Sequence, residues 1–178
     1  MSPWFVVVAA VLLSLERIAY VVIWRAPDTF CTFCARPMVR PFGEPIDILQ
    51  KFFYGFKGVQ LAVFFGWCYG YGNGKLWPPD SGGLALCIGA LLIVAGQLLN
   101  YSVFAQLGKV GVFYGNKMGY EVPWCRDFPF SVLNHPQYIG ASLSIWGFFL
   151  VMRFPYDDWY VLPAIETLYY ALGAHFEQ

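Results

Sequence analysis

Charged side chains are scarce in this sequence. They make up 12% of its 178 residues, whereas soluble proteins carry about 25%. Hydrophobic residues reach 58% and aromatic residues 20%. A soluble core of this size is too small to bury so much apolar surface, so we expect a lipid bilayer to be the solvent of the protein. The 11 basic and 11 acidic residues cancel, which leaves no electrostatic reason to expect a nucleic-acid partner.

Several motifs are missing as well. No glycine fingerprint follows a predicted strand, so a nucleotide-like cofactor would have to be held by helices rather than by a Rossmann domain. Cys31 and Cys34 form the only C-x-x-C pair. No second pair completes a zinc site, so we expect ordinary loop cysteines and no bound metal. The alternating pattern of a membrane barrel is also absent, which leaves helices as the way to satisfy the backbone in lipid.

Five apolar segments are separated by stretches rich in proline, glycine and charge: residues 3–24, 48–71, 84–107, 138–152 and 159–173. The first segment has no basic residues before it and no small-residue cleavage site after it, so we expect a retained helix rather than a signal peptide. The last two are shorter than the roughly 20 residues of a full span. We therefore expect an all-α integral membrane protein with four to five transmembrane or intramembrane helices, in one domain over residues 1–178.

The few charged residues predict how these segments are arranged. Basic residues gather in residues 25–47 and 108–134, which two predicted spans separate, so both regions should lie on one side, the cytosolic one. Glu16 and Arg17 interrupt the first segment. Neighbours on a helix point about 100° apart, so we do not expect an ideal pair; either the helix is only partly inserted or these charges have partners on other helices. Two lysines of the second segment should extend to the membrane interface: Lys51 and Lys57.

The most unusual polar run, Asn134-His135-Pro136, directly precedes the fourth apolar segment. Pro136 suits the first position of a helix, where its missing N–H costs nothing, and Asn134 or His135 would cap that helix. The free backbone N–H groups of such a helix end can face an anion or a carboxylate. An ordinary helix start at the membrane surface explains the same residues equally well.

Two further polar groups stand out. In the stretch AGQLLN, residues 95–100, Gly96 allows a close approach, and Gln97 and Asn100 share one helix face. A polar contact between helices is the alternative explanation there. The C-terminal AHFEQ carries His175 and Glu177. That carboxylate can bind ribose hydroxyls or a cationic ligand, unless the tail is simply solvated.

Together these groups resemble the phospholipid N-methyltransferases, small membrane enzymes that convert phosphatidylethanolamine derivatives to phosphatidylcholine. The plant-type phosphatidyl-N-methylethanolamine N-methyltransferases are the most similar. The resemblance covers roughly residues 90–178 and is carried by the stretches GQLLNYSVFAQLGKVGVFYG and VPWCRDFPFSVLNHPQYIGA and by the terminal glutamate. A simple H-P-x-Y-x-G also occurs in the wider isoprenylcysteine methyltransferase group.

The resemblance implies S-adenosylmethionine as methyl donor, with no metal. It also implies phosphatidyl-N-methylethanolamine and phosphatidyl-N,N-dimethylethanolamine as acceptors, in the endoplasmic reticulum membrane. The family's terminal acidic pair falls on Glu177 and Gln178, and the second position departs from that pattern. By position, the cofactor-binding residues that it implies are Val94, Ala95, Gly96, Asn134, His135, Pro136, Tyr138, Gly140, Glu177 and Gln178.

The chemistry adds candidate roles. Transfer of a methyl group to an amine requires the neutral amine, and the candidates for a general base are His135, Glu121 and Glu166. A lipid phosphate would meet the basic residues of the loop before Asn134. We favour Arg126 there for its planar fork, followed by Lys117 and Lys109. The alternative is that all three only attract anionic lipid headgroups.

Two alternatives stay open: a related membrane methyltransferase of the isoprenylcysteine carboxyl type, and a non-catalytic membrane protein whose polar groups join helices. The expected partners are a phospholipid substrate and the lipid bilayer, and a homo-oligomer is left open.

Overall fold

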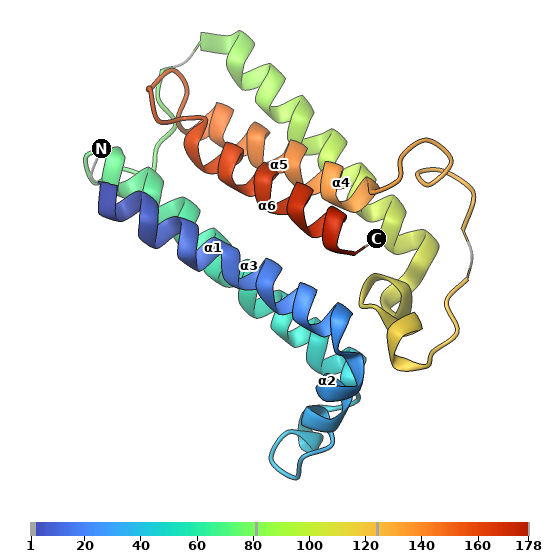
Figure 1. Ribbon diagram of the computed structural model, residues 1–178. Coiled ribbons are helices and arrows are strands. Elements are labelled where there is room, and N and C mark those ends of the chain that lie inside the picture. Colours follow the sequence, from blue (N-terminus) through green and yellow to red (C-terminus); the bar gives the residue numbers. More distant parts are fainter. Residues whose placement is uncertain (1–2, 81, 124, 178) are drawn as a thin grey trace.

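The protein is built from helices, as the sequence predicts. The computed structural model describes residues 3–80, 82–123 and 125–177. Within them lie six α-helices and two short 3-10 helices (Figure 1): α1 (Pro3–Arg25), α2 (Pro27–Cys34), η1 (Arg40–Phe42), α3 (Pro45–Tyr71), α4 (Gly82–Val112), η2 (Gly115–Met118), α5 (Pro136–Met152) and α6 (Val161–Phe176). The five predicted apolar segments correspond to α1, α3, α4, α5 and α6.

Local sequence explains where the long helices begin and end. Pro45 occupies the first position of α3, and Glu44 and Asp47 form a reciprocal capping box around it, which satisfies two otherwise free backbone N–H groups. Helix α4 is interrupted at Gly108, where φ is 61° and ψ is −174°. A residue with a side chain rarely adopts that backbone conformation. The polar segment that follows therefore leaves the axis of α4.

Residues 25–47, whose prolines and charges are typical of a loop in water, nevertheless include the short helix α2. Pro27 stands at the start of this helix, where proline is well tolerated. Phe30 and Cys34 are buried in a cluster with Leu49 and Phe113. A helix of 8 residues is too short to be stable alone, so this packing, which its proline-rich sequence does not reveal, stabilises it.

Helices α4 and α5 pack closely along a seam of glycines. A Cβ atom added to Gly147 would lie 2.5 Å from the backbone oxygen of Gly89, and one added to Gly96 would lie 2.3 Å from that of Gly140. Both distances are far inside van der Waals contact, so the absence of side chains is what allows the two backbones to approach. Such small-residue seams are a common way to associate helices in lipid, where apolar burial gives no driving force.

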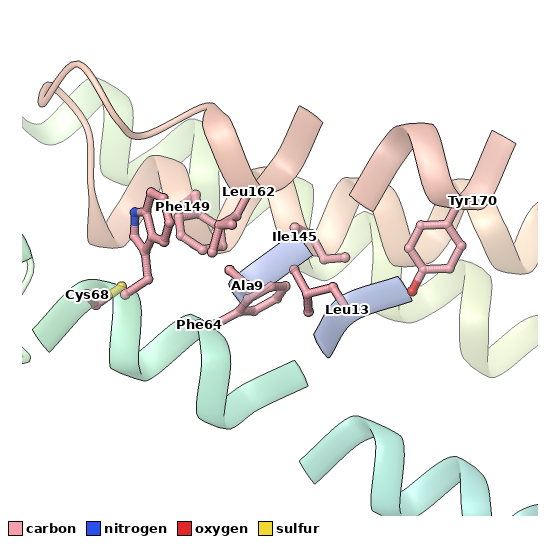
Figure 2. Close-up of a cluster of buried hydrophobic side chains, with 9 residues drawn as sticks. Ala9, Leu13, Phe64, Cys68, Ile145, Phe149, Leu162 and Tyr170 are labelled. Carbon is pink, nitrogen blue, oxygen red and sulfur yellow. The ribbon is translucent and has the colours of Figure 1, made fainter. Parts of the chain in front are cut away.

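A second contact region joins α1 and α3 to α5 and α6. Figure 2 shows Leu13, Phe64, Phe149 and Leu162 from these four helices meeting in one apolar cluster. Phe149 and Leu162 are fully buried. A buried polar group closes the cluster at the end where α5 turns into α6: Trp67 Nε1 donates to Asp158 at 3.0 Å, and Arg153 donates to the same carboxylate at 2.9 Å.

The outer faces of α1 and α4 are apolar. Both helical stretches, Pro3–Arg25 and Gly82–Met118, are long and apolar enough to cross a membrane. On α4, Leu91, Val94 and Leu98 are each more than half exposed. Water would penalise such a continuous surface, whereas lipid accommodates it.

The two basic loops lie at the same end of the helix bundle (Figure 1). Lys109, at the end of α4, forms an ion pair with Asp47 in the first turn of α3. The ammonium group of Lys117 in η2 lies 4.1 Å from the ring centre of Trp24, at the end of α1. We call this the α2 end. The α3–α4 and α5–α6 connections lie at the opposite end.

Substituting Gly147 by Ala tests the glycine seam. The added Cβ would push against the backbone of α4, so we expect a loss of about 1–3 kcal/mol in the free energy of unfolding. Gly66→Ala on α3 is the matched control, because nothing lies within 4 Å of its added Cβ and alanine favours a helix. Thermal unfolding of both variants in detergent measures the difference. Equal melting temperatures would contradict the close packing of α4 and α5.

The arrangement of the loops predicts their sidedness. Met38 and Val132, 86% and 72% exposed at the α2 end, and Trp77, 83% exposed at the opposite end, are suitable sites for single cysteines. In sealed vesicles, an impermeant maleimide should label the first two from one side and the third from the other. Labelling of positions 38 and 132 from opposite sides would refute the shared orientation.

Candidate active site

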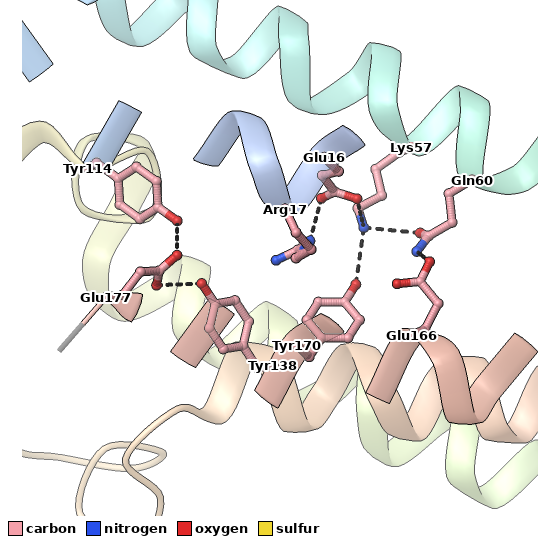
Figure 3. Close-up of polar contacts among 9 residues, drawn as sticks. All are labelled: Glu16, Arg17, Lys57, Gln60, Tyr114, Tyr138, Glu166, Tyr170 and Glu177. Atoms are coloured by element: carbon pink, nitrogen blue, oxygen red, sulfur yellow. Dashed lines mark hydrogen bonds and ion pairs between the residues drawn. The ribbon is translucent and has the colours of Figure 1, made fainter. Parts of the chain in front are cut away.

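A cavity of about 1270 Å³ lies among α1, α3, α4, α5 and α6. Ligand sites for one small molecule usually measure about 300–1,000 Å³, so this cavity is large enough for two ligands side by side. Aromatic and aliphatic side chains form most of its wall. Among the polar groups that face it, the charged ones fall into two sets, one around Glu177 and one around Arg17 (Figure 3).

The first set surrounds the carboxylate of Glu177, directly after α6. Tyr114 donates its hydroxyl to one carboxylate oxygen at 2.6 Å, and Tyr138 donates to the other (Figure 3). All three residues line the cavity. The terminal glutamate is therefore not a solvated tail. It is a carboxylate held in a fixed position by hydroxyls from two separate parts of the chain.

Tyr114 reaches this carboxylate from an uncommon backbone conformation. Its φ of 57° and ψ of 32° are left-handed, which is unfavourable for a bulky residue. The ring is held in place between Tyr20 and Trp24 of α1, with ring centres 5.8 Å and 5.2 Å away. Packing against α1 thus compensates the backbone cost and directs the hydroxyl to Glu177.

The start of α5 forms the neighbouring part of the wall. Pro136 is the first residue of this helix, as predicted, and His135 precedes it without a side-chain capping hydrogen bond. The first helical bond runs from Ile139 N–H to His135 O, at 3.2 Å. The N–H groups of Gln137 and Tyr138 consequently have no partner within the helix. The His135 ring is stacked on that of Tyr138, with centres 5.9 Å apart.

The second polar set is a buried group of charges, of which sequence reasoning singled out Glu16 and Arg17 without placing them in a site. Glu16 accepts hydrogen bonds from Arg17 at 2.6 Å and from Lys57 at 3.2 Å. Lys57 also donates to Gln60 and to the Tyr170 hydroxyl, while Gln60 donates to Glu166. The expected partner on another helix is confirmed for Glu16, which Lys57 of α3 contacts, and two other expectations are corrected. Glu16 and Arg17 do pair, because their long side chains bridge the angle between them, and Lys57 turns inward instead of extending to the interface. The signal was available in the two charges inside an apolar segment.

Comparison with known proteins identifies the family to which this chain belongs. The family described as phospholipid methyltransferase matches residues 84–178, more than half of the chain. The chain belongs to the phospholipid methyltransferase family. The phosphatidyl-N-methylethanolamine N-methyltransferase of Arabidopsis thaliana is 28% identical over 123 residues, which cover 69% of this chain and 65% of that relative. No solved structure matches the chain significantly.

Half of the cofactor-binding residues implied by the family resemblance face the cavity: Asn134, His135, Pro136, Tyr138 and Glu177. The others do not line it within the described part of the chain. Val94 and Ala95 are exposed on the outer face of α4, and Gly96 and Gly140 face each other in the α4–α5 seam. In this structure Gly96 and Gly140 serve helix packing and Val94 and Ala95 an outward-facing surface, and cofactor contact by these four residues stays a prediction. Gln178 lies outside the described residues.

The proposed bases and phosphate-binding residues likewise divide into those that line the cavity and those that do not. Of the three proposed bases, His135 lines the cavity, Glu121 is exposed in the loop after η2, and Glu166 is 1% exposed behind Gln60. The three basic residues proposed to bind the lipid phosphate do not line the cavity within the described part of the chain. Lys109 and Lys117 are engaged by Asp47 and Trp24, and Arg126 is exposed.

Two other sequence signals have structural explanations. Gln97 donates to Ser144 of α5 at 2.9 Å, the contact between helices given above as the alternative, and Asn100 lines the cavity. Cys31 and Cys34 are free thiols. Burial raises the pKa of Cys31, and it raises that of Cys34 to about 11, so neither is activated as a nucleophile.

The buried charges predict a stability effect at Lys57. Lys57→Met leaves Glu16 with one cation and breaks the link to Tyr170. Loss of a fully buried partner costs about 3–5 kcal/mol. We expect about 1–3 kcal/mol here, because Arg17 still pairs with Glu16 and the Lys57 side chain keeps 26% exposure. Lys75→Met, at an exposed lysine, is the control. Chemical or thermal unfolding that is equal in the two variants would contradict a stabilising role.

Proposed function

We propose that the protein is an S-adenosylmethionine-dependent phospholipid N-methyltransferase. Its acceptors would be phosphatidyl-N-methylethanolamine and phosphatidyl-N,N-dimethylethanolamine, and its final product phosphatidylcholine. The observation that carries the proposal is the position of the Glu177 carboxylate. Tyr114 and Tyr138 hold it beside the start of α5, in the cavity among the helices. From the resemblance we also infer the endoplasmic reticulum membrane as its location.

The residues present fit the cofactor. S-adenosylmethionine supplies a methyl group on a positively charged sulfur and also carries an ammonium and a carboxylate group. A fixed carboxylate such as Glu177 attracts the positive groups. The free N–H groups at the start of α5 suit a carboxylate. Both features line one cavity.

The chain's own contribution would be positioning. Two substrates, one from water and one from lipid, have to meet with the amine in line with the methyl group, and correct placement is the largest effect that a protein can supply in such a displacement. The amine has to lose its proton first. His135 is the candidate base that faces the cavity, within the same wall as Glu177.

Methyl transfer from labelled S-adenosylmethionine to lipid vesicles tests the proposal. With phosphatidyl-N-methylethanolamine we expect the dimethyl and then the trimethyl lipid as products. Turnover of a farnesylated cysteine, with none of the lipid, would favour the isoprenylcysteine type instead. A protein that binds no cofactor and methylates neither acceptor would support the non-catalytic alternative.

Variants connect this activity to the cavity. Glu177→Gln removes the fixed charge and should weaken S-adenosylmethionine binding by about 1.5–3 kcal/mol, or roughly 10- to 150-fold. His135→Ala should weaken binding or slow turnover. Asp80→Asn, an exposed carboxylate in the α3–α4 connection, is the control and should behave like the wild type. Calorimetry in detergent measures the affinity, and unaltered binding in both site variants would mean that the cofactor binds elsewhere.

A further inference from the structure

Arg17 is a buried arginine whose hydrogen-bonding capacity is largely unused. The residue is 8% exposed and lines the cavity. Its guanidinium group carries five N–H donors, of which one Nη2 bond, to Glu16, is made within the described residues. Its Nε is buried without a partner. Buried donors are rarely left in this state unless a ligand or water completes them.

Tyr20 presents a second unpartnered donor beside it. The two residues are three apart, so they share one face of α1, and the guanidinium carbon lies 5.4 Å from the Tyr20 ring centre. Tyr20 is 7% exposed, lines the cavity, and its buried hydroxyl has no partner among the described residues. Two adjacent buried donors without acceptors are unfavourable, so a ligand that offers an acceptor would be stabilised here.

The guanidinium group of Arg17 is held in place by contacts that do not use its N–H donors. Its carbon lies 4.3 Å from the ring centre of Tyr170 and 5.6 Å from that of Tyr138. Cation–π contacts of this sort fix the position of the group and leave its N–H donors free.

Lys57, the other buried cation, is in a different state. Its ammonium group has three donors, and the structure shows three acceptors for it: Glu16 at 3.2 Å, Gln60 at 3.0 Å and Tyr170 at 3.3 Å. The capacity to bind a further acceptor therefore belongs to Arg17.

We propose that Arg17 and Tyr20 bind the oxyanion of a ligand in the cavity, a phosphate or a carboxylate. The planar fork of arginine suits both groups, because it can donate two parallel hydrogen bonds. This inference rests on the proposed function and deepens it. The lipid acceptor carries one such group, its phosphodiester, and the methyl donor carries the other, its carboxylate.

The assignment moves anion binding away from the basic loop. The cations near Asn134 in sequence are exposed or engaged elsewhere, whereas Arg17 comes from a helix outside the 84–178 family match. The N-terminal half of the chain thus supplies the positive side of the cavity and Glu177 the negative side. Tyr138 lies between them, with its ring facing Arg17 and its hydroxyl on Glu177 (Figure 3).

Tyr20→Phe is the decisive variant. The lost hydroxyl has no partner among residues 3–80, 82–123 and 125–177, so the melting temperature without ligand should not fall, and affinity for the anionic ligand should drop roughly 10-fold or more. Arg17→Lys keeps the charge and the pair with Glu16 but loses the fork, and should lower affinity similarly. Arg25→Gln, an exposed arginine two turns further along α1, is the control.

Two binding measurements in detergent identify the source of the oxyanion. One titrates S-adenosylmethionine and decarboxylated S-adenosylmethionine, and the other titrates a short-chain phosphatidyl-N,N-dimethylethanolamine without cofactor. If Arg17 and Tyr20 bind the carboxylate, the variants lose affinity for S-adenosylmethionine and keep their affinity for decarboxylated S-adenosylmethionine and for the lipid. If the phosphate is bound, they lose affinity for the lipid alone.

Unchanged affinity for both ligands in Tyr20→Phe and Arg17→Lys would overturn the inference and would mean that water completes these donors. Because both readouts are binding measurements, they are separate from turnover. A wild type that binds these ligands and does not methylate the lipid would refute the proposed function, while the comparison of the variants would still decide the role of Arg17.

Discussion

Charges buried in an apolar bundle must find partners within it, and this requirement shapes the centre of the protein. Glu16 of α1 holds two cations, one from its own helix and one from α3. Through Tyr170 and Gln60 the same group reaches α6. Few apolar contacts could specify the relative positions of three helices so closely, because dispersion contacts are not directional whereas hydrogen-bonded charges are. The group that joins the helices also forms one wall of the cavity, so the fold and the candidate site depend on the same interactions.

The family motifs act mostly through backbone geometry. Gly96 and Gly140 allow α4 and α5 to come into contact. This contact positions the first turn of α5, so that His135 and Tyr138 face the cavity. Gly108 ends the straight part of α4 and allows the chain to reach Tyr114, whose hydroxyl meets Glu177. A glycine motif beside a ligand site is therefore not evidence of ligand contact by itself. Here its members position the side chains that face the cavity.

Much of the fold could be predicted from the sequence, because five long apolar runs are bounded by proline, glycine and charge. Helix α2 could not, since its stability comes from contacts of Phe30 and Cys34 with distant residues. The candidate site was predicted in part. The run from Asn134 to Tyr138 and the distant Glu177 do meet, as the resemblance implied. The cations that line the cavity could not be predicted, because proximity in sequence does not reveal which basic side chain faces a cavity and which one is engaged by a neighbour, as Lys109 is by Asp47.

The division of the cavity between the two halves of the chain follows from this arrangement. The family match covers residues 84–178, which contribute Glu177, its two tyrosines and the start of α5. Helices α1 and α3 precede the match and contribute Glu16, Arg17, Tyr20 and Lys57. A zwitterionic lipid headgroup and a cofactor with charges of both signs each need opposite charges at a fixed separation. In this cavity the Tyr138 side chain separates the Arg17 guanidinium from the Glu177 carboxylate, because its ring faces Arg17 and its hydroxyl donates to Glu177. The N-terminal helices contribute two cations and one carboxylate, a net positive charge, and the matched half contributes the Glu177 carboxylate, so the packing of α1 against α5 and α6 is what brings these two charged groups to one cavity.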